Sequence, residues 1–236
     1  MAAKARPDHQ LKVYIVGGNI LITKMFYEFG SLFVGTRDIG AADIVVFTGG
    51  PDVDPKLYNE RRLPGTYINE SRDTKDLEAW LQCREDQFKV GICRGAQFLN
   101  VCNEGKLWQD IDEHTRPHMM EDIVTGRKIW VSSTHHQQMI PGPLCTMIAK
   151  AHEAGVKQSE TREWRKTSKK GQLILPGTGK IIYDPDAIDH EVLWYEKTRS
   201  FCFQPHPELP GFGVCRSYFF GTMMQHYHDS NPKKAA

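Results

Sequence analysis

A cysteine stands between two glycines in the segment Gly91-Ile92-Cys93-Arg94-Gly95-Ala96-Gln97. The apolar residues before Cys93 predict the end of a buried strand, and Phe98, Leu99 and Val101 after it recur at helical spacing. Cys93 is therefore expected at a sharp strand-to-helix turn, where the two glycines avoid crowding. Such a turn exposes the sulfur and points a helix N-terminus at it, which favours the reactive thiolate. A lone cysteine here would be interpreted as structural, but two further segments supply partners for a nucleophile.

The segment Pro205-His206-Pro207-Glu208 supplies a base and a carboxylate. Proline on both sides of His206 favours an extended chain, in which residues two apart share a face. His206 and Glu208 can then converge, with the carboxylate orienting the imidazole as in a catalytic triad. His206 would keep Cys93 ionised and later protonate a leaving amine. By itself the segment is better explained as a rigid turn, but beside Cys93 it favours catalysis.

A Gly-Gly loop supplies the remaining part of the predicted site. Thr48-Gly49-Gly50-Pro51 follows an apolar run at 43–47 that is typical of a buried parallel strand, and ligands bind beyond the C-terminal ends of such strands. Because Pro51 has no N–H, Gly50 is the expected donor, beside the amide of Arg94 at the helix N-terminus. Alone, the loop fits a plain turn equally well. With Cys93 it predicts an oxyanion hole, and therefore acyl transfer through a thioester without cofactor or metal.

Histidines elsewhere give no metal pattern. His135 and His136 follow a strand expected at 128–132, and adjacent residues of a strand point to opposite faces, so at most one of them would face Cys93. His114 and His118 fall in a surface loop expected to run to about residue 122. The six cysteines show neither a CxxC pair nor metal-ligand spacing.

Alternating strand and helix patterns predict an open α/β sheet, mostly parallel and flanked by helices, with an antiparallel extension towards the C-terminal half. In the helix expected over 69–86, one apolar face holds Leu77, Trp80 and Leu81. The expected strands cover 11–16, 31–34, 43–47, 90–92, 128–132, 144–149, 191–195 and 200–204, and the other helices 20–29 and 213–228.

The chain has 236 residues and a formal net charge of +1, which suits one domain and gives no argument for nucleic acid or membrane binding. Neither a signal peptide nor a membrane span is predicted, so we expect a cytoplasmic protein with reduced cysteines. Residues 1–10 and 230–236 are expected to be flexible ends. The segment 152–188, which contains a basic run and a predicted hairpin, is interpreted either as a solvated insertion or as a docking surface or lid.

Together these segments resemble class I glutamine amidotransferase domains, and more closely the γ-glutamyl hydrolase branch, such as γ-glutamyl-γ-aminobutyrate hydrolases. The matches cover about residues 43–140 and 200–210 and occur in the order of the family. Besides the cysteine and histidine segments, they comprise residues 49–60, Arg72-Asp73, Leu107-Trp108-Gln109-Asp110 and Ser133-Thr134-His135-His136-Gln137.

The resemblance implies a flavodoxin-like core and a Cys93–His206–Glu208 triad. It also implies an oxyanion hole formed by the amides of Gly50 and Arg94. The α-amino and carboxylate end of a glutamyl substrate would be held by Gln97, Ser133, Thr134 and His135.

The sequence departs from the branch around the mouth of this site. Glu104 stands where a glycine is usual, and Asp189-His190 where an Asp-Gly turn is usual. Residues 152–188 replace a short connection. These departures leave the triad intact and the amine part of the substrate open.

The resemblance implies a hydrolase of γ-glutamyl amides with a small-molecule substrate. One version acts alone on a γ-glutamyl amine or peptide. The other hydrolyses glutamine and passes ammonia to a separate synthase partner. A non-catalytic ligand-binding module on the same fold is the alternative from another class, and an intact triad disfavours it.

Overall fold

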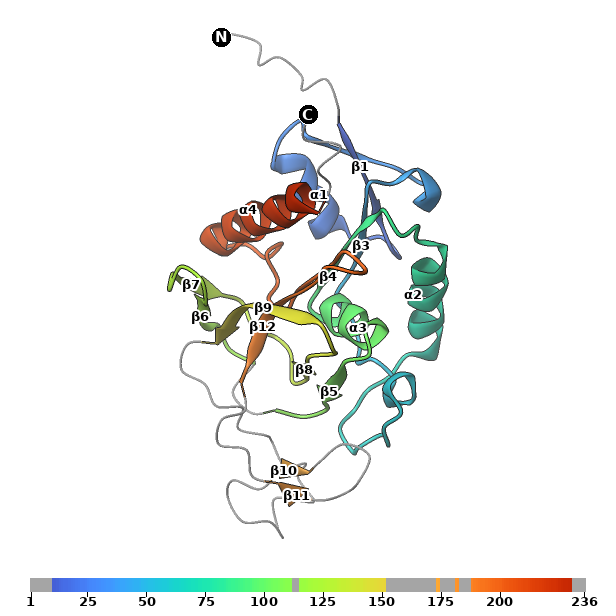
Figure 1. Ribbon diagram of the computed structural model, residues 1–236, viewed down its shortest axis with the longest axis vertical. Coiled ribbons are helices and arrows are strands. Elements are labelled where there is room, and N and C mark those ends of the chain that lie inside the picture. Colours follow the sequence, from blue (N-terminus) through green and yellow to red (C-terminus); the bar gives the residue numbers. More distant parts are fainter. Residues whose placement is uncertain (1–9, 112–114, 152–172, 175–180, 183–187, 231–236) are drawn as a thin grey trace.

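A nine-stranded sheet in the order β2-β1-β3-β4-β13-β12-β9-β6-β7 organises the computed structural model of the chain (Figure 1). The structure describes residues 10–111, 115–151, 173–174, 181–182 and 188–230. Most of the predicted flexible ends and of the insertion at 152–188 therefore lie outside the described residues.

In this order, β2, β1, β3, β4 and β13 are parallel to one another, and β12, β9, β6 and β7 continue the sheet with antiparallel pairing. The predicted fold class, including its antiparallel extension, is confirmed. The main strands are β1 (Leu11–Ile15), β2 (Phe33–Gly35), β3 (Ile44–Phe47), β4 (Phe88–Ile92), β6 (His118–Asp122), β7 (Lys128–Val131), β9 (Cys145–Ala151), β12 (His190–Tyr195) and β13 (Ser200–Phe203). Two small sheets pair β5 (Lys106–Trp108) with β8 (Gln138–Ile140), and β10 (Leu173–Ile174) with β11 (Ile181–Ile182).

Helices cover both faces of the parallel part, because its strands are apolar on both sides. In β3, Ile44 and Val46 belong to one buried cluster, while Val45 and Phe47 belong to the other. The first cluster is closed by α1 (Ile20–Glu28) and α4 (Gly213–Asp229), and the second by α2 (Glu70–Gln82) and α3 (Arg94–Cys102) (Figure 1). Because β3, β4 and β13 are neighbouring parallel strands, their carboxyl ends lie side by side. The three predicted site segments follow these ends.

The buried face of α2 agrees with the prediction in part. Leu77 and Trp80 pack against the second cluster as expected, but Leu81 is 80% exposed, whereas Asp73 and Asp76 are buried. The inward face is acidic because both carboxylates pair with the buried Arg94 guanidinium, and hydrophobic spacing alone could not show that.

The predicted surface loop over 107–122 is also wrong in part. Residues 106–108 form β5, and residues 118–122 form β6, which pairs with both β7 and β9. His118 thus lies in the sheet, where its Nε2 atom is 2.9 Å from a carboxylate oxygen of Glu191. His114 lies outside the described residues.

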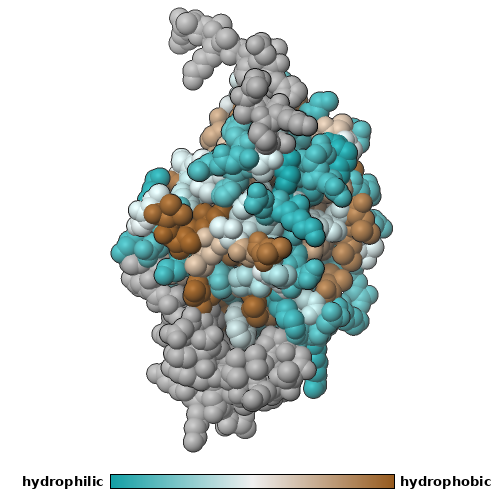
Figure 2. All heavy atoms as spheres, viewed as in Figure 1, coloured by the Kyte–Doolittle hydropathy of each residue, from teal (hydrophilic) through white to brown (hydrophobic). Residues whose placement is uncertain are grey.

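The face shown in Figure 2 carries apolar side chains in separate small groups among hydrophilic ones. Such scattered apolar residues are usual on a folded domain and do not by themselves mark an interface. Among the described helices, none has the length and apolar character needed to span a bilayer.

Glu104 follows the C-terminal end of α3 and has a φ of 65°, in the left-handed region. This conformation costs a residue with a Cβ about 1–2 kcal/mol, whereas glycine adopts it freely. We expect Glu104→Gly to raise the free energy of unfolding by about 1 kcal/mol, measured by urea denaturation. Glu104→Ala is the matched control, because alanine keeps the Cβ. An equal gain in both variants would contradict the backbone explanation.

Candidate active site

Cys93 occupies a strained turn between β4 and α3. Its φ of 53° and ψ of −112° are unusual for a residue with a side chain. A Cβ at Gly91 would lie 2.4 Å from the carbonyl oxygen of Gly95, and a Cβ at Gly95 would lie 2.1 Å from that of Phe47. The turn therefore requires glycine at position 91, as predicted, whereas Gly95 is required because the start of α3 lies against the end of β3.

His206 and Glu208 converge beside the cysteine. The Nδ1 atom of His206 is 2.7 Å from Oε1 of Glu208. The ring and the cysteine flank Gly49: a Cβ built there would lie 2.9 Å from Cε1 of His206 and 3.8 Å from the Cβ of Cys93. Burial of the ring opposes protonation, but the charge of Cys93 and the hydrogen bonds to Cys93 and Glu208 outweigh it and raise the pKa of His206 to about 10. The imidazole is therefore a proton donor at neutral pH.

Ser132 fixes the position of His206, a role that the sequence did not indicate. Its hydroxyl accepts a hydrogen bond from the backbone N–H of His206 at 2.8 Å and donates to the carbonyl oxygen of the same residue at 3.0 Å. Ser132 directly follows β7 and stands next to the predicted Ser133. Only the approach of two segments 74 residues apart distinguishes the two serines.

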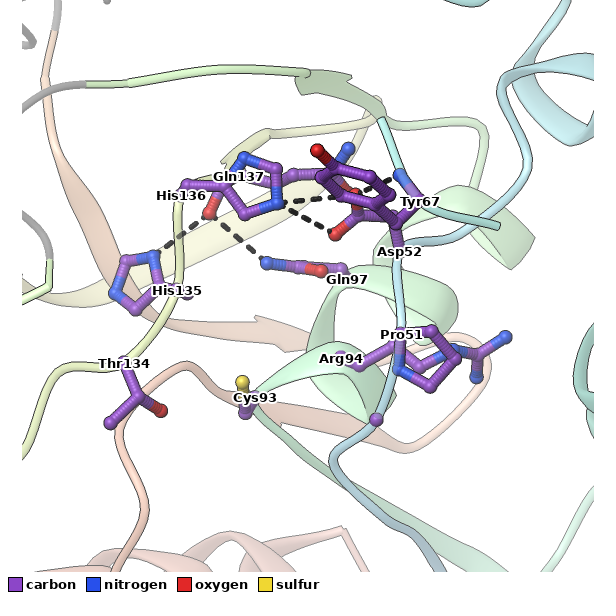
Figure 3. Close-up of a pocket in the computed structure, with 11 residues that line it drawn as sticks. Pro51, Asp52, Tyr67, Cys93, Arg94, Gln97, Thr134, His135, His136 and Gln137 are labelled. Atoms are coloured by element: carbon purple, nitrogen blue, oxygen red, sulfur yellow. Dashed lines mark hydrogen bonds and ion pairs between the residues drawn. The ribbon is translucent and has the colours of Figure 1, made fainter. Parts of the chain in front are cut away.

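A cavity of about 250 Å³ opens above Cys93. Figure 3 shows the sulfur directed into the space between Gln97, Thr134 and His135. Ser133 is buried but does not line the cavity. The cavity is lined by Gly50, Pro51, Asp52, Tyr67, Cys93, Arg94, Gln97, Thr134, His135, His136 and Gln137.

Gln97 and His135 are both held by one backbone carbonyl. The Nε2 atom of Gln97 donates to the carbonyl oxygen of Gln137 at 3.0 Å, and Nδ1 of His135 lies 2.9 Å from that oxygen. Gln97 also donates to the Gln204 side chain at 3.3 Å. The wall above Cys93 is therefore built from polar groups with fixed orientations.

The prediction that at most one histidine of the pair faces Cys93 is wrong, because His135 and His136 both line the cavity. The structure shows no strand between Val131 and Gln138, so the alternation of a strand does not apply to them.

Asp52 and Tyr67 were not predicted as site residues. The Asp52 carboxylate accepts a hydrogen bond from the Tyr67 amide at 2.7 Å, and the Asp52 amide donates to the Tyr67 carbonyl at 2.9 Å. Asp52 thereby ties a distant loop to the rim of the cavity. The sequence signal was the aspartate after Gly-Gly-Pro, but its partners depend on tertiary structure.

His136 lies between two carboxylates. Its Nε2 atom is 3.1 Å from both Asp52 oxygens, and its Nδ1 atom is 3.5 Å from Asp110. Hydrogen bonds to Asp110 and Asp52 outweigh burial and raise the pKa of His136 to about 10. This ring is therefore charged at neutral pH.

The His136 cluster should stabilise the fold in a pH-dependent way. A pKa raised above the unfolded value of about 6.5 gives stability that is complete below that pH and is lost as pH rises towards 10. We expect wild type to be more stable than His136→Gln at pH 6, and this difference to shrink by pH 10. Urea unfolding at pH 6, 8 and 10 measures it, and a constant difference would contradict the assignment.

Within the described ranges, no group of three or more His, Cys, Asp or Glu side chains is placed to hold a metal ion. Cys93 lines the cavity, whereas His206 and Glu208, which lie beside Cys93, do not.

Residues 36–165 match a family model described as Peptidase C26, which is more than half of the chain. The chain belongs to the peptidase C26 family. The matched stretch contains the Gly-Gly loop, Cys93 and the paired histidines, whereas His206 and Glu208 lie beyond it.

Two relatives of this C26 member match it over half of the chain or more at 25–28% identity. The glutamine amidotransferase-like protein YvdE of Lactococcus lactis is 28% identical over 148 residues, which are 51% of this chain and 61% of YvdE. The match thus spans less than two thirds of that relative. Protein NtpR of Enterococcus hirae is 25% identical over 184 residues, 72% of this chain and 69% of NtpR.

Solved structures share the fold of this C26 member. A candidate GMP synthase subunit from Thermoplasma acidophilum superposes with a TM-score of 0.61 at 14% identity, covering 97% of this chain and 99% of that one. A glutamine amidotransferase from Thermotoga maritima superposes with a TM-score of 0.53 at 14% identity, and the match covers 96% of this chain and 86% of that one. At these identities the likeness concerns the fold alone.

Proposed function

We propose that this protein is a cysteine hydrolase that cleaves a γ-glutamyl amide bond. The observation that carries the proposal is that Cys93, placed on a strained turn, and a His206 ring oriented by Glu208 lie on the same side of Gly49, each within 4 Å of the position of a Cβ there. A thiol, a proton-carrying imidazole and an orienting carboxylate are the parts of a nucleophilic triad.

In the proposed reaction, the Cys93 thiolate attacks the γ-carbonyl carbon, and the carbonyl oxygen becomes an oxyanion. The backbone N–H groups of Gly50 and Arg94 would stabilise that charge. His206 then gives its proton to the leaving amine, and a γ-glutamyl thioester remains on Cys93. Attack of water, with His206 as base, releases glutamate and restores the thiolate.

The glutamyl end would occupy the cavity above the sulfur. Gln97, Thr134 and His135 present polar groups there, and these could bind the α-amino and α-carboxylate groups of the substrate. Ser133, buried behind this wall, would support Thr134 and His135 rather than contact the substrate.

The family model and the name of the YvdE relative support hydrolysis of a glutamine-like amide, and the Gly49–Glu60 segment favours the γ-glutamyl hydrolase branch. A second candidate is a glutaminase that supplies ammonia to a separate synthase. The name of one solved structure with this fold, a GMP synthase subunit, suggests this candidate, but at 14% identity the likeness itself concerns the fold alone.

Glutamate release from the purified chain separates these candidates. The panel contains L-glutamine, γ-glutamyl ethylamide and γ-glutamyl-γ-aminobutyrate. Cleavage of γ-glutamyl amines supports a stand-alone hydrolase, and turnover of glutamine alone supports ammonia supply. Absence of cleavage, together with failure of an electrophilic glutamine analogue to label Cys93, would contradict the hydrolase and favour a binding module.

A further inference from the structure

Arg72, on α2, binds the backbone of the Gly-Gly loop that follows β3. Its Nη2 atom donates to the Thr48 carbonyl at 2.8 Å and to the Thr48 hydroxyl at 3.0 Å, while Nη1 donates to the Gly49 carbonyl at 3.0 Å. Two consecutive carbonyl groups are thus bound by one planar guanidinium. The fixed fork of an arginine suits this arrangement, and the single ammonium of a lysine does not.

The guanidinium is itself held in place by buried charge. Its Nε atom lies 3.1 Å from Oδ1 of Asp76, a side chain with no exposed surface. The other oxygen of Asp76 binds Arg94, which also pairs with Asp73. Two arginines and two aspartates therefore balance, as a buried ionic cluster requires, and Arg72 cannot leave without unbalancing it.

The peptide between Gly49 and Gly50 lies between this cluster and the site. A Cβ at Gly50 would be 2.7 Å from Nη1 of Arg72, whereas a Cβ at Gly49 would be 2.9 Å from Cε1 of His206 and 3.8 Å from the Cβ of Cys93. In a planar trans peptide the C=O and N–H groups point in opposite directions. Binding of the Gly49 oxygen on the Arg72 side therefore directs the Gly50 N–H away from Arg72.

Glycine on both sides of this peptide makes rotation easy, because no Cβ opposes it. A rotation by about half a turn would replace the N–H by a carbonyl oxygen, which would repel an oxyanion. We propose that Arg72 is a positioning residue that locks the Gly49–Gly50 peptide with its N–H towards the Cys93 site. This inference rests on the proposed function for its kinetic consequence, but not for its structural one.

The kinetic test uses Arg72→Met and Arg72→Lys, with Arg84→Met as the matched control. Arg84 also binds a carboxylate, that of Asp86, and a backbone carbonyl, that of Gly40, but it precedes β4 at the opposite end from Cys93. For the best substrate of the panel, we expect kcat to fall roughly 10²–10³-fold in Arg72→Met, as for a lost oxyanion donor. KM of Arg72→Met should change less than about threefold. The fall in kcat should be smaller in Arg72→Lys, and kcat and KM of Arg84→Met should equal those of wild type.

Alkylation of Cys93 by iodoacetamide separates positioning from general damage. In that reaction the sulfur displaces iodide from a CH₂ carbon and no oxyanion forms. Its rate should therefore stay within about twofold of wild type in Arg72→Met while kcat falls. If the rates of alkylation and of amide cleavage fell by the same factor, Arg72 would have a merely structural role and the proposal would be overturned. An unchanged kcat would overturn it as well.

A crystal structure of Arg72→Met tests the lock without any substrate. We expect the Gly49 carbonyl to be rotated or present in two orientations, with β3 and α3 unchanged. A single wild-type orientation would overturn the inference even if the protein proves to hydrolyse nothing. If wild type is inactive but the Gly49–Gly50 peptide rotates in Arg72→Met, the proposed function is wrong and the positioning role of Arg72 is confirmed.

Discussion

Replacing Cys93 with alanine is expected to lower the rate of γ-glutamyl amide cleavage by a factor of roughly 10⁴ or more. The sulfur is the group that forms the covalent bond in the proposed reaction, and no other described cysteine lines the cavity. The remaining groups can bind substrate but cannot form the thioester. The measurement is glutamate release under saturating substrate, together with substrate binding by calorimetry, which should be preserved.

Cys83→Ala is the matched control for this variant. Burial raises the pKa of the Cys83 thiol to about 11, and it lies at the end of α2, away from the cavity, so its loss should leave activity unchanged. If Cys93→Ala retained more than about one hundredth of the wild-type activity, the sulfur could not be the nucleophile.

Arg94→Met is expected to lower the free energy of unfolding by about 3–5 kcal/mol, the usual cost of removing one partner from a buried ion cluster. Arg94 is 1% exposed and pairs with both Asp73 and Asp76. Burial already raises the pKa of the Asp73 carboxyl although Arg94 faces it. Without the guanidinium, the buried carboxylate would be more costly still. Urea unfolding near pH 7 measures the effect.

Two controls show whether charge causes this loss. Adding Asp73→Asn to Arg94→Met should restore part of the stability, because the uncompensated carboxylate is removed. Lys24→Met breaks the exposed pair with Glu28 and should cost less than about 1 kcal/mol. A double variant no more stable than Arg94→Met would contradict the electrostatic explanation and indicate lost packing instead.

The sequence predicted the parts of the site that are local. The turn at Cys93 follows from a strand, two glycines and a helix that are adjacent in the chain, and the His206–Glu208 contact follows from prolines that fix the backbone between them. The parallel sheet was equally predictable, since buried runs such as 44–47 have few alternative interpretations. The crowding at Gly91 could be anticipated because it arises within the turn, whereas the close approach of Gly95 to Phe47 depends on a distant strand.

What the sequence could not show depends on contacts between distant segments. The acidic inner face of α2 makes sense only when Arg94 is placed against it. The exposure of both His135 and His136 to the cavity depends on the end of β7 at Val131. Ser132 could not be chosen over Ser133 without knowing that His206 lies beside it. Hydrophobic periodicity carries no information on such polar contacts.

The most direct test of the central claim is to trap the acyl-enzyme. Wild-type protein mixed with its best γ-glutamyl substrate is quenched in acid within milliseconds and digested, and the peptides are analysed by mass spectrometry. We predict a γ-glutamyl group on the peptide that contains Cys93, absent from Cys93→Ala. Release of glutamate without this adduct at any quench time, or with an adduct on another residue, would contradict the assignment of Cys93 as the nucleophile.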